Sequence, residues 1–149
     1  MLALIVVANP SPNGLSHAMA SAAQRVLVAR GYEIAHHDLY AEQFDPVQPT
    51  GEVGNVASSN ELVEQHCSEL ARADLIIIFH PNWWGQPPAI LKGWIDRVFR
   101  LNTAYTYPPG LGLEGIPAGL RMYAPVSSSS AQQRATWLSE VTALVENAA

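Results

Sequence analysis

Hydrophobic residues along this chain alternate between short continuous runs and longer periodic stretches. Leu2–Ala8 and Leu75–Phe79 are continuous apolar runs, a pattern typical of strands buried on both faces of a parallel sheet. Tyr32–Leu39 and Arg121–Val126 are interpreted as two further strands. The sequence therefore predicts four strands, separated from one another by longer segments.

The segments between the strands carry the signals of helices. Ser16 is a candidate N-cap, and Gly31 is a plausible residue just beyond a helix end. Ser58 to Glu61 has the S-x-x-E form of a capping box. In the central stretch, apolar residues fall on one helical face after two prolines that suit a first turn. Helices are expected at residues 16–31, 59–71, 87–99 and 131–146.

Four strands that alternate with four helices predict an α/β fold, a doubly wound parallel sheet in a three-layer α/β/α arrangement. The first unit, residues 2–39, implies a right-handed parallel crossover. The length of 149 residues fits one domain, residues 1–149, with a sizeable core. In such sheets ligands bind in the crevice beyond the carboxyl ends of the strands. The loops that follow the strands are therefore the candidate sites.

Composition narrows the classes of partner. The net charge of −5 gives no electrostatic reason to expect a nucleic acid, and no apolar run approaches the roughly 18–20 residues of a membrane span. No basic region precedes Leu2–Ala8, which favours a first strand over a signal peptide. The single cysteine, Cys67, excludes an intrachain disulfide and a cysteine-rich metal site. A cytoplasmic protein without a membrane span is expected.

The first candidate loop follows the first strand. Asn9–Gly14 is a dense turn signal before a helix, and a helix N-terminus presents free N–H groups to an anion. Gly14 permits a close approach, and the hydroxyl groups of Ser11 and Ser16 can donate to a phosphate. The alternative is an ordinary turn followed by a serine N-cap. The chain lacks the G-x-G-x-x-G dinucleotide fingerprint.

The second candidate loop, His80–Gln86, contains two adjacent tryptophans, Trp83 and Trp84. A planar apolar ligand with a polar edge would suit two indole rings and the N–H groups of a loop. The alternative is that both rings cover the core or a subunit interface.

The other polar residues give weaker signals. His36 and His37 point to opposite faces of a strand, so they cannot share a metal ion, and no metal site is expected. His80, at the end of the third strand, is interpreted as a hydrogen-bonded structural residue. A solvated helix face is expected to carry the charged residues spaced i, i+4, namely Lys92, Asp96 and Arg100.

Four segments together resemble a known family. They are ANPSPNGLSHA at residues 8–18, DLYAEQFDPV at 38–47, HPNWWGQPPAILKGWIDRVF at 80–99 and AYTY at 104–107. Over about residues 2–120, the chain is similar to the flavodoxin-like NAD(P)H:quinone oxidoreductases. These include the ancillary flavoproteins of glutathione-gated potassium efflux systems.

The resemblance implies a flavin enzyme. NAD(P)H would reduce a bound FMN or FAD, and the flavin would then reduce a quinone or similar small aromatic acceptor in a ping-pong cycle. The first loop would hold the flavin phosphate, and Pro81–Gly85 would bound the isoalloxazine ring. In a homodimer typical of the family, Tyr105 and Tyr107 would help to close the substrate pocket of the neighbouring subunit. No catalytic acid or base is assigned. The implied cofactor-binding residues are Asn9, Ser11, Gly14, Leu15, Ser16, Ala18, Pro81, Asn82, Trp83, Trp84 and Gly85.

The first loop departs from the family pattern. The chain has Asn9 where His is usual, and Gly14, Leu15 and Ser16 where Ser, Phe and Asn are usual. A hydroxyl group is therefore missing at Gly14, which predicts weaker phosphate binding.

The C-terminal part departs as well, because four strands are predicted where family members usually have five. Either a block near residue 120 is missing, or residues 121–126 form the fourth strand and Ser127–Ser130 replaces its flavin-contacting loop. Two functions stay open on this basis. One is a flavin-dependent NAD(P)H:quinone oxidoreductase, and the other is a degenerate, non-catalytic binding or regulatory module.

Overall fold

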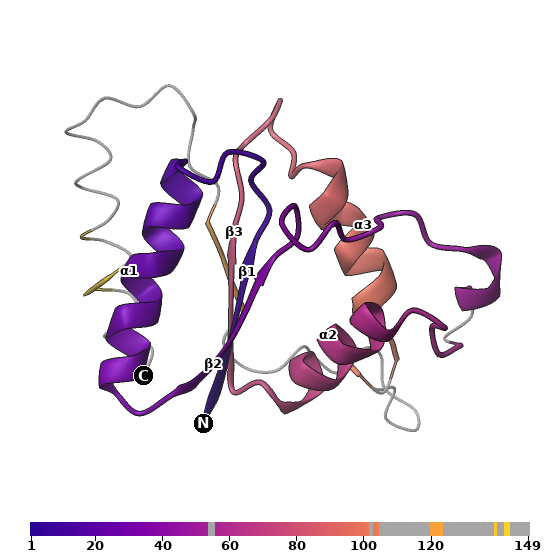
Figure 1. The fold of residues 1–149 in the computed structure, drawn as a ribbon, viewed down its shortest axis with the longest axis horizontal. Coiled ribbons are helices and arrows are strands. Elements are labelled where there is room, and N and C mark those ends of the chain that lie inside the picture. Colours follow the sequence, from indigo (N-terminus) through magenta and orange to yellow (C-terminus); the bar gives the residue numbers. More distant parts are fainter. Residues whose placement is uncertain (54–55, 102, 105–119, 124–138, 140–141, 144–149) are drawn as a thin grey trace, which may run out of the picture.

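The computed structural model describes residues 1–53, 56–101, 103–104, 120–123, 139 and 142–143 (Figure 1). The elements in chain order are β1 (Leu2–Val7), α1 (Leu15–Ala29), β2 (Glu33–Asp38), the 3₁₀ turn η1 (Thr50–Glu52), α2 (Glu61–Arg72), β3 (Leu75–Phe79), α3 (Ala89–Val98) and β4 (Leu120–Tyr123). Tyr105, Tyr107 and most of the expected last helix, 131–146, lie outside the described residues. No helix among the described residues is long and apolar enough to cross a membrane.

The described strands form one sheet in the order β2-β1-β3-β4, and every pairing is parallel. β1 lies at the centre, with Val6 opposite both His37 of β2 and Ile78 of β3. The strand predicted at residues 121–126 is present at 120–123, directly beside β3. The predicted doubly wound parallel sheet is therefore confirmed. The chain adds β2 on one side of β1 and then β3 and β4 on the other side, so the switch point of the sheet lies between β1 and β3.

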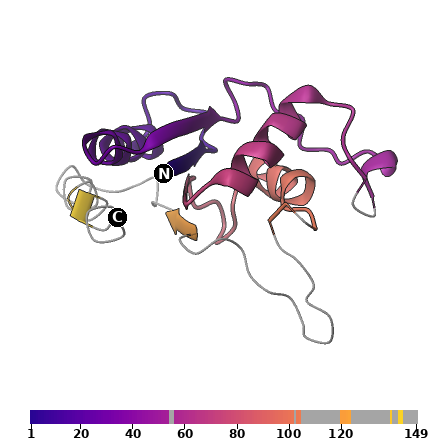
Figure 2. The same ribbon diagram turned by 90° about the horizontal axis from the view of Figure 1, so that it is seen from below.

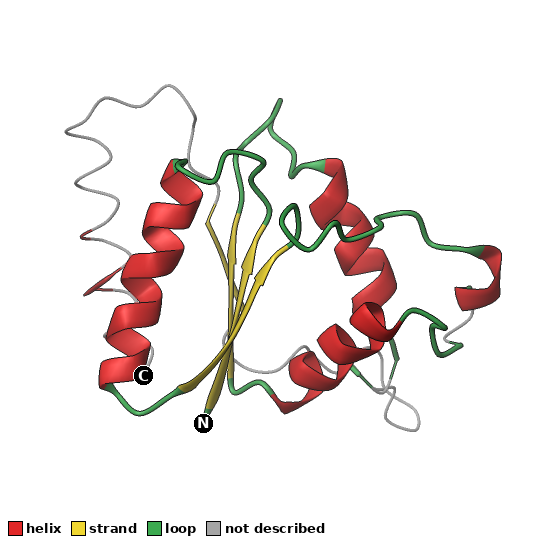
Figure 3. Ribbon diagram, in the orientation of Figure 1, coloured by secondary structure: helices red, strands yellow, loops and turns green. Residues whose placement is uncertain are grey.

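Helices cover both faces of this sheet. α1 lies on one face and α2 and α3 lie on the other (Figures 2 and 3). Successive residues of a strand point to opposite faces, so Ile5 packs in the core beneath α1 while Leu4 and Val6 pack beneath α2 and α3. Both faces are buried, which is why β1 and β3 read as continuous apolar runs rather than as alternating patterns.

The two predicted helix caps are wrong, although the helices are present. α1 begins after Gly14, and Ser16 lies buried in its first turn, where its Oγ accepts a hydrogen bond from Asn9 Nδ2 at 3.2 Å. The Ser16 hydroxyl therefore bonds the Asn9 side chain and does not cap the helix. Gly31, with φ of 81°, follows the end of α1 as predicted.

α2 is capped by Asn60 and not by a Ser58–Glu61 box. Asn60 Oδ1 accepts hydrogen bonds from the N–H groups of Leu62 at 3.0 Å and Val63 at 3.3 Å. Ser58 N–H donates instead to the Glu64 carboxylate at 2.6 Å. Asparagine is at least as good an N-cap as serine, and it stands closer to the first helical residue.

The predicted solvated face of α3 is only partly correct. Lys92 and Asp96 form an exposed pair, with Nζ 2.6 Å from Oδ2. Arg100 is instead buried, and its guanidinium bonds the Glu64 carboxylate at 2.7 Å and the backbone carbonyl of Val56 at 2.9 Å. The i, i+4 spacing could not reveal these partners, because both lie more than 30 residues away in the sequence.

The long connection between β2 and α2 is held against α3 by a buried ion pair. Glu52 and Arg97 are 4% and 3% exposed, and the guanidinium donates from Nε to Oε2 at 2.9 Å and from Nη2 to Oε1 at 2.7 Å. Arg97 Nη1 also donates to the carbonyl of Asp45 at 2.6 Å. The bidentate bond with Arg97 holds the pKa of the Glu52 carboxyl below its usual value.

Candidate functional site

The two loops singled out by the sequence lie side by side at one edge of the sheet. β1 and β3 are neighbours, and Ala8 N–H donates to the carbonyl of Phe79 at 2.8 Å just where both strands end. The first loop, residues 8–14, and the second loop, residues 80–88, leave the sheet at the same end (Figure 1). In a doubly wound sheet of this order, the β1/β3 switch point is where ligands bind.

Asn9 organises the first loop. Its Oδ1 accepts a hydrogen bond from Ser11 N–H at 3.0 Å, and its Nδ2 donates to Ser16 Oγ at 3.2 Å. A Cβ atom at Gly14 would lie 2.7 Å from Asn9 Nδ2 and 2.9 Å from the carbonyl oxygen of Ser11. A side chain at position 14 would therefore crowd both the Ser11 carbonyl and the Asn9 amide, which explains the glycine in this loop.

The N-terminus of α1 is open to an anion. Within the described part of the chain no side-chain cap is recorded there, and the first N–H groups of a helix have no acceptor within the helix. The helix dipole favours negative charge at the same place. Leu15 is half-buried and Ala18 is exposed, whereas the hydroxyl of Ser16 is buried and turned to Asn9. Any contribution of this segment to anion binding therefore comes mainly from backbone N–H groups.

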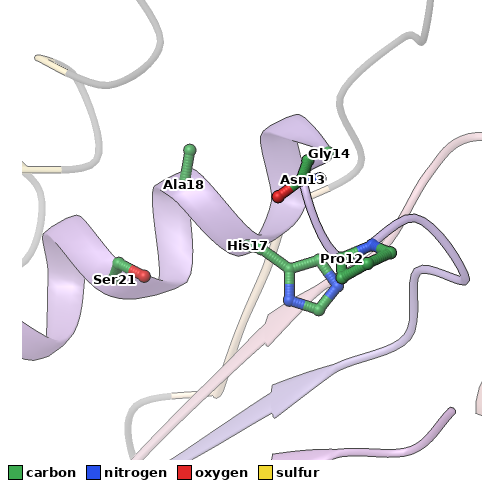
Figure 4. Close-up of a pocket in the computed structure, with 6 residues that line it drawn as sticks. All are labelled: Pro12, Asn13, Gly14, His17, Ala18 and Ser21. Atoms are coloured by element: carbon green, nitrogen blue, oxygen red, sulfur yellow. The ribbon is translucent and has the colours of Figure 1, made fainter. Parts of the chain in front are cut away.

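A hollow of about 230 Å³ lies against the start of α1. Figure 4 shows the residues that line it, which come from the first loop and the first two turns of the helix. They are Pro12, Asn13, Gly14, His17, Ala18 and Ser21.

A neighbouring hollow of about 240 Å³ joins the first loop to the turn after β2. Asp38 and Tyr40 form its far wall, and Asp38 Oδ1 accepts hydrogen bonds from the N–H groups of Tyr40 at 3.1 Å and Ala41 at 3.2 Å. His17 bridges the two sides, with Nε2 3.1 Å from the carbonyl of Asn9 and Nδ1 3.8 Å from Asp38 Oδ2. Burial raises the pKa of the Tyr40 phenol.

His17, Asp38 and Tyr40 were not predicted as site residues. The signal that could have found Asp38 and Tyr40 is their place at the carboxyl end of β2, because the ends of all parallel strands meet at one edge. His17 follows the first loop by one helical turn, which brings it back over that loop.

The second loop is a tight hairpin that carries both tryptophans. Trp83 N–H donates to the Gln86 carbonyl at 3.0 Å, and Gln86 N–H donates to the Trp83 carbonyl at 2.9 Å. Between them, Trp84 and Gly85 have φ of 54° and 78°, which is a two-residue type I′ turn. A bulky residue rarely adopts positive φ, and such strain is found preferentially at functional sites.

This turn presents both indoles outward. Trp84 is fully exposed and Trp83 is 42% exposed, so neither ring covers the core of this chain. Pro81 is buried, Asn82 is half-buried and Gly85 is exposed beside the indoles. The second loop therefore combines a rigid base with an exposed aromatic tip.

The structure places His80 as predicted, and it places His36 and His37 on opposite faces of β2. His80 is buried, and its Nδ1 lies 2.9 Å from the carbonyl of Pro81, as a structural histidine would. His36 is exposed and lies 3.0 Å from Gln24 of α1, whereas His37 is buried on the opposite face, beside Glu69 of α2.

The chain is a doubly wound α/β protein in which the two loops predicted as site loops lie together at the β1/β3 switch point. The sequence profile of a family described by its flavodoxin-like fold matches residues 1–142, and the chain belongs to this family. The family resemblance seen in the sequence motifs is thereby confirmed.

Known proteins are similar over most of the chain. The NAD(P)H dehydrogenase (quinone) 1 of Rattus norvegicus is 37% identical over 124 residues, which cover 70% of this chain and 45% of that protein. The structure of Smu.1420 from Streptococcus mutans UA159 has a TM-score of 0.80 at 26% identity and covers 99% of this chain and 100% of its own.

A third match, an FMN-dependent NADH-azoreductase from Bacillus anthracis str. Ames Ancestor in complex with FMN, shares the fold. Its TM-score is 0.58 at 17% identity, with 95% of this chain and 75% of that chain covered. The chain spans about half the length of the curated relatives that it matches.

Proposed function

We propose that this protein is a flavin-dependent oxidoreductase that takes electrons from NAD(P)H and passes them to a quinone or similar small aromatic acceptor. The observation that carries the proposal is the meeting of an uncapped helix N-terminus and an exposed pair of indoles at the β1/β3 switch point. A flavin nucleotide has a phosphate for the first feature and a planar ring for the second. The names of the quinone dehydrogenase and of the FMN-dependent azoreductase support the same assignment.

The residues present fit such a cofactor. Backbone N–H groups at Leu15 and Ser16 would hold the phosphate, with Asn9 fixing the loop around them. Ser11 is exposed and offers a hydroxyl donor, and Ala18 leaves room on the helix surface. Pro81–Gly85 would bound the isoalloxazine ring, which supplies the hydride chemistry when bound. These residues bind and orient the cofactor, and they keep water from the ring face that they cover.

The proposal extends to a ping-pong cycle, a homodimer and an acceptor pocket shared between subunits. A ping-pong cycle requires that NAD(P)H and the acceptor use the same exposed ring face in turn. Homodimer formation would cover Trp84, whose complete exposure leaves one side of the site open in a single chain. Tyr105 and Tyr107 of a neighbouring subunit would then close the acceptor pocket, in a cytoplasmic enzyme. Titration with each flavin distinguishes FMN from FAD as the cofactor.

Replacing Asn13 by aspartate is expected to weaken FMN binding while leaving riboflavin binding unchanged. Asn13 is exposed, lines the hollow beside α1 and precedes the N-cap Gly14. An added carboxylate would repel a phosphate at this helix start by about 1 kcal/mol, which is roughly a 5- to 10-fold increase in Kd. Riboflavin lacks the phosphate and would not respond. The measurement is titration of each flavin by fluorescence quenching.

The matched control is Ser59→Asp, which adds the same charge one residue before the N-cap of α2. Both aspartates should stabilise their helices slightly through the dipole, but only Asn13→Asp should affect FMN. Equal Kd values of wild type and Asn13→Asp for FMN would contradict a phosphate at α1. No binding of FMN or FAD to folded wild-type protein would favour the non-catalytic module.

A further inference from the structure

Two buried histidines and two half-buried glutamates form a group on the sheet face opposite α1. This histidine–glutamate cluster consists of His37 on β2, Glu42 in the following turn, and His66 and Glu69 on α2. His37 Nδ1 lies 2.8 Å from Glu42 Oε1, and His37 Nε2 is hydrogen-bonded to Glu69 Oε2. The rings of His37 and His66 lie 3.7 Å apart between centroids. His66 is fully buried and His37 is 4% exposed.

The hydrogen-bond partners fix where the protons are. Trp94 Nε1–H of α3 donates to His66 Nδ1 at 2.8 Å, so the ring proton of His66 is on Nε2. That nitrogen faces Glu42 Oε2 at 3.4 Å, and neither atom has another partner. Both ring nitrogens of His37 face carboxylates, which only accept hydrogen bonds. His37 must therefore donate from both nitrogens, as an imidazolium.

A metal ion is the obvious alternative, since ligand atoms of His37, Glu42 and His66 lie within 4.8 Å of one another. The chemistry of His66 opposes it. A metal bound at Nε2 requires the lone pair there and the proton on Nδ1, but Trp94 already donates to Nδ1. The N–H groups of Trp94 and of His66 Nδ1 would then face each other in a buried site. The arrangement of donors and acceptors therefore favours bound protons over a metal ion.

We infer that the histidine–glutamate cluster is a proton-dependent latch, in which the charged ring of His37 clamps the turn after β2 onto α2 and releases it when the proton leaves. A neutral His37 has one N–H group and can serve only one of its two carboxylates. The other would be left as a half-buried anion without its partner, close to a second carboxylate. Loss of one proton therefore weakens both sides of the clamp.

The groups around His37 define the direction of the pH dependence. Glu69 and His66 face it from α2, Glu42 faces it from the turn, and Trp94 lies beyond His66 on α3. Its strand partner on β1 is the apolar Val6. Burial alone would lower the pKa of His37, but its hydrogen bonds to both carboxylates outweigh burial and raise the pKa above 6.5. This stabilisation is complete below pH 6.5 and is lost as the pH rises through the raised value.

The acidic limit comes from the carboxylates. Burial would raise the pKa of Glu42, but the hydrogen bond from His37 and the nearby ring of His66 outweigh it and lower the pKa from 4.5 to about 2. That contribution is present above pH 4.5 and is lost as the pH falls towards 2. The latch is therefore closed in mildly acidic solution and opens as the pH rises through the raised pKa of His37.

The clamped turn forms part of the hollow beside the first loop. Glu42 N–H donates to the Asp38 carbonyl at 2.9 Å, and Phe44 N–H donates to the Leu39 carbonyl at 3.0 Å. Asp38 and Tyr40, in the same turn, line the hollow of about 240 Å³. Opening the latch would loosen this wall, so the shape of the hollow depends on pH.

The direct test is an NMR titration of the full chain, in which the ring nitrogens report the protonation state of His36 and His37 at each pH. His36 is the matched control, because it is exposed on the other face of the same strand and its pKa is lowered, chiefly by burial. His37 is expected to carry protons on both nitrogens at about pH 6 and to titrate at a higher pH than His36. Titration of His37 together with His36, or below it, would overturn the latch.

Stability against pH gives the second test. The Tm difference between wild type and His37→Gln should shrink as the pH rises from about 6 to 9, by ~3–5 °C if folding raises the pKa of His37 by one, whereas His36→Gln should follow wild type. If His37→Gln does not fold, Glu69→Gln serves, and it should lower the pKa of His37. Parallel pH profiles of all variants would contradict the latch. So would a Zn²⁺-induced rise in Tm that His66→Ala abolishes.

Discussion

Replacing Glu52 by glutamine is expected to lower the free energy of unfolding by about 3–5 kcal/mol. The substitution keeps the shape of the side chain but leaves the guanidinium of Arg97 buried without its counter-charge. It also places an amide N–H group where Arg97 or the Ser58 hydroxyl now donates. Equilibrium denaturation in urea measures the loss, read from the midpoint at constant slope.

Two further variants separate the buried charge from the pair itself. Arg97→Met should destabilise by a similar amount, and the Glu52→Gln/Arg97→Met double variant should recover part of the loss, because no charge is left uncompensated. Asp96→Asn breaks the exposed pair with Lys92 on the same helix and should change stability by less than about 1 kcal/mol. Equal effects at Glu52 and Asp96 would contradict the role given to the buried pair.

Replacing Gly93 by alanine is expected to destabilise the protein by about 3 kcal/mol. In an open helix the same change would stabilise by up to about 1 kcal/mol, because glycine is a poor helix former. Here the Cβ atom would lie 2.2 Å from the carbonyl oxygen of Pro46 and 2.5 Å from its Cα. α3 would have to part from the connection that Glu52 and Arg97 hold against it.

Gly51→Ala is the control for Gly93→Ala, since a Cβ atom at Gly51 meets nothing within 4 Å. It should change the unfolding free energy by less than about 0.5 kcal/mol. Thermal melts of both variants give the comparison. A Gly93→Ala protein as stable as wild type would show that the connection between β2 and α2 does not pack tightly on α3.

The strands of this fold could be predicted because burial on both faces leaves a local mark. A run such as Leu75–Phe79 needs no knowledge of its neighbours to be recognised. The order β2-β1-β3-β4 was not predicted, because the pattern of apolar runs does not reveal that the chain crosses from β2 past β1 to reach β3. The exposed tryptophans were also predictable, because a loop with two adjacent large aromatic side chains cannot easily bury both.

Side-chain partners that lie far apart in the sequence could not be predicted. Arg100 has the spacing of a surface charge, but Glu64 and Val56 come together around it only once α2 packs against α3. The histidine–glutamate cluster has the same origin, since His37 and His66 are 29 positions apart. The same limit applies to Ser16 over a short range. A serine near a helix start predicts an N-cap, but the sequence does not reveal that its hydroxyl is hydrogen-bonded to Asn9.

The most direct test of the central claim is the visible absorption spectrum of the purified protein. It is recorded after incubation with FMN or FAD and again after anaerobic addition of NADPH or NADH. Flavin bands that remain with the protein on desalting, bleach on adding the nicotinamide and return on adding a quinone are the predicted result. A folded protein that stays colourless after incubation with excess FMN and FAD would contradict a flavin site at the β1/β3 edge.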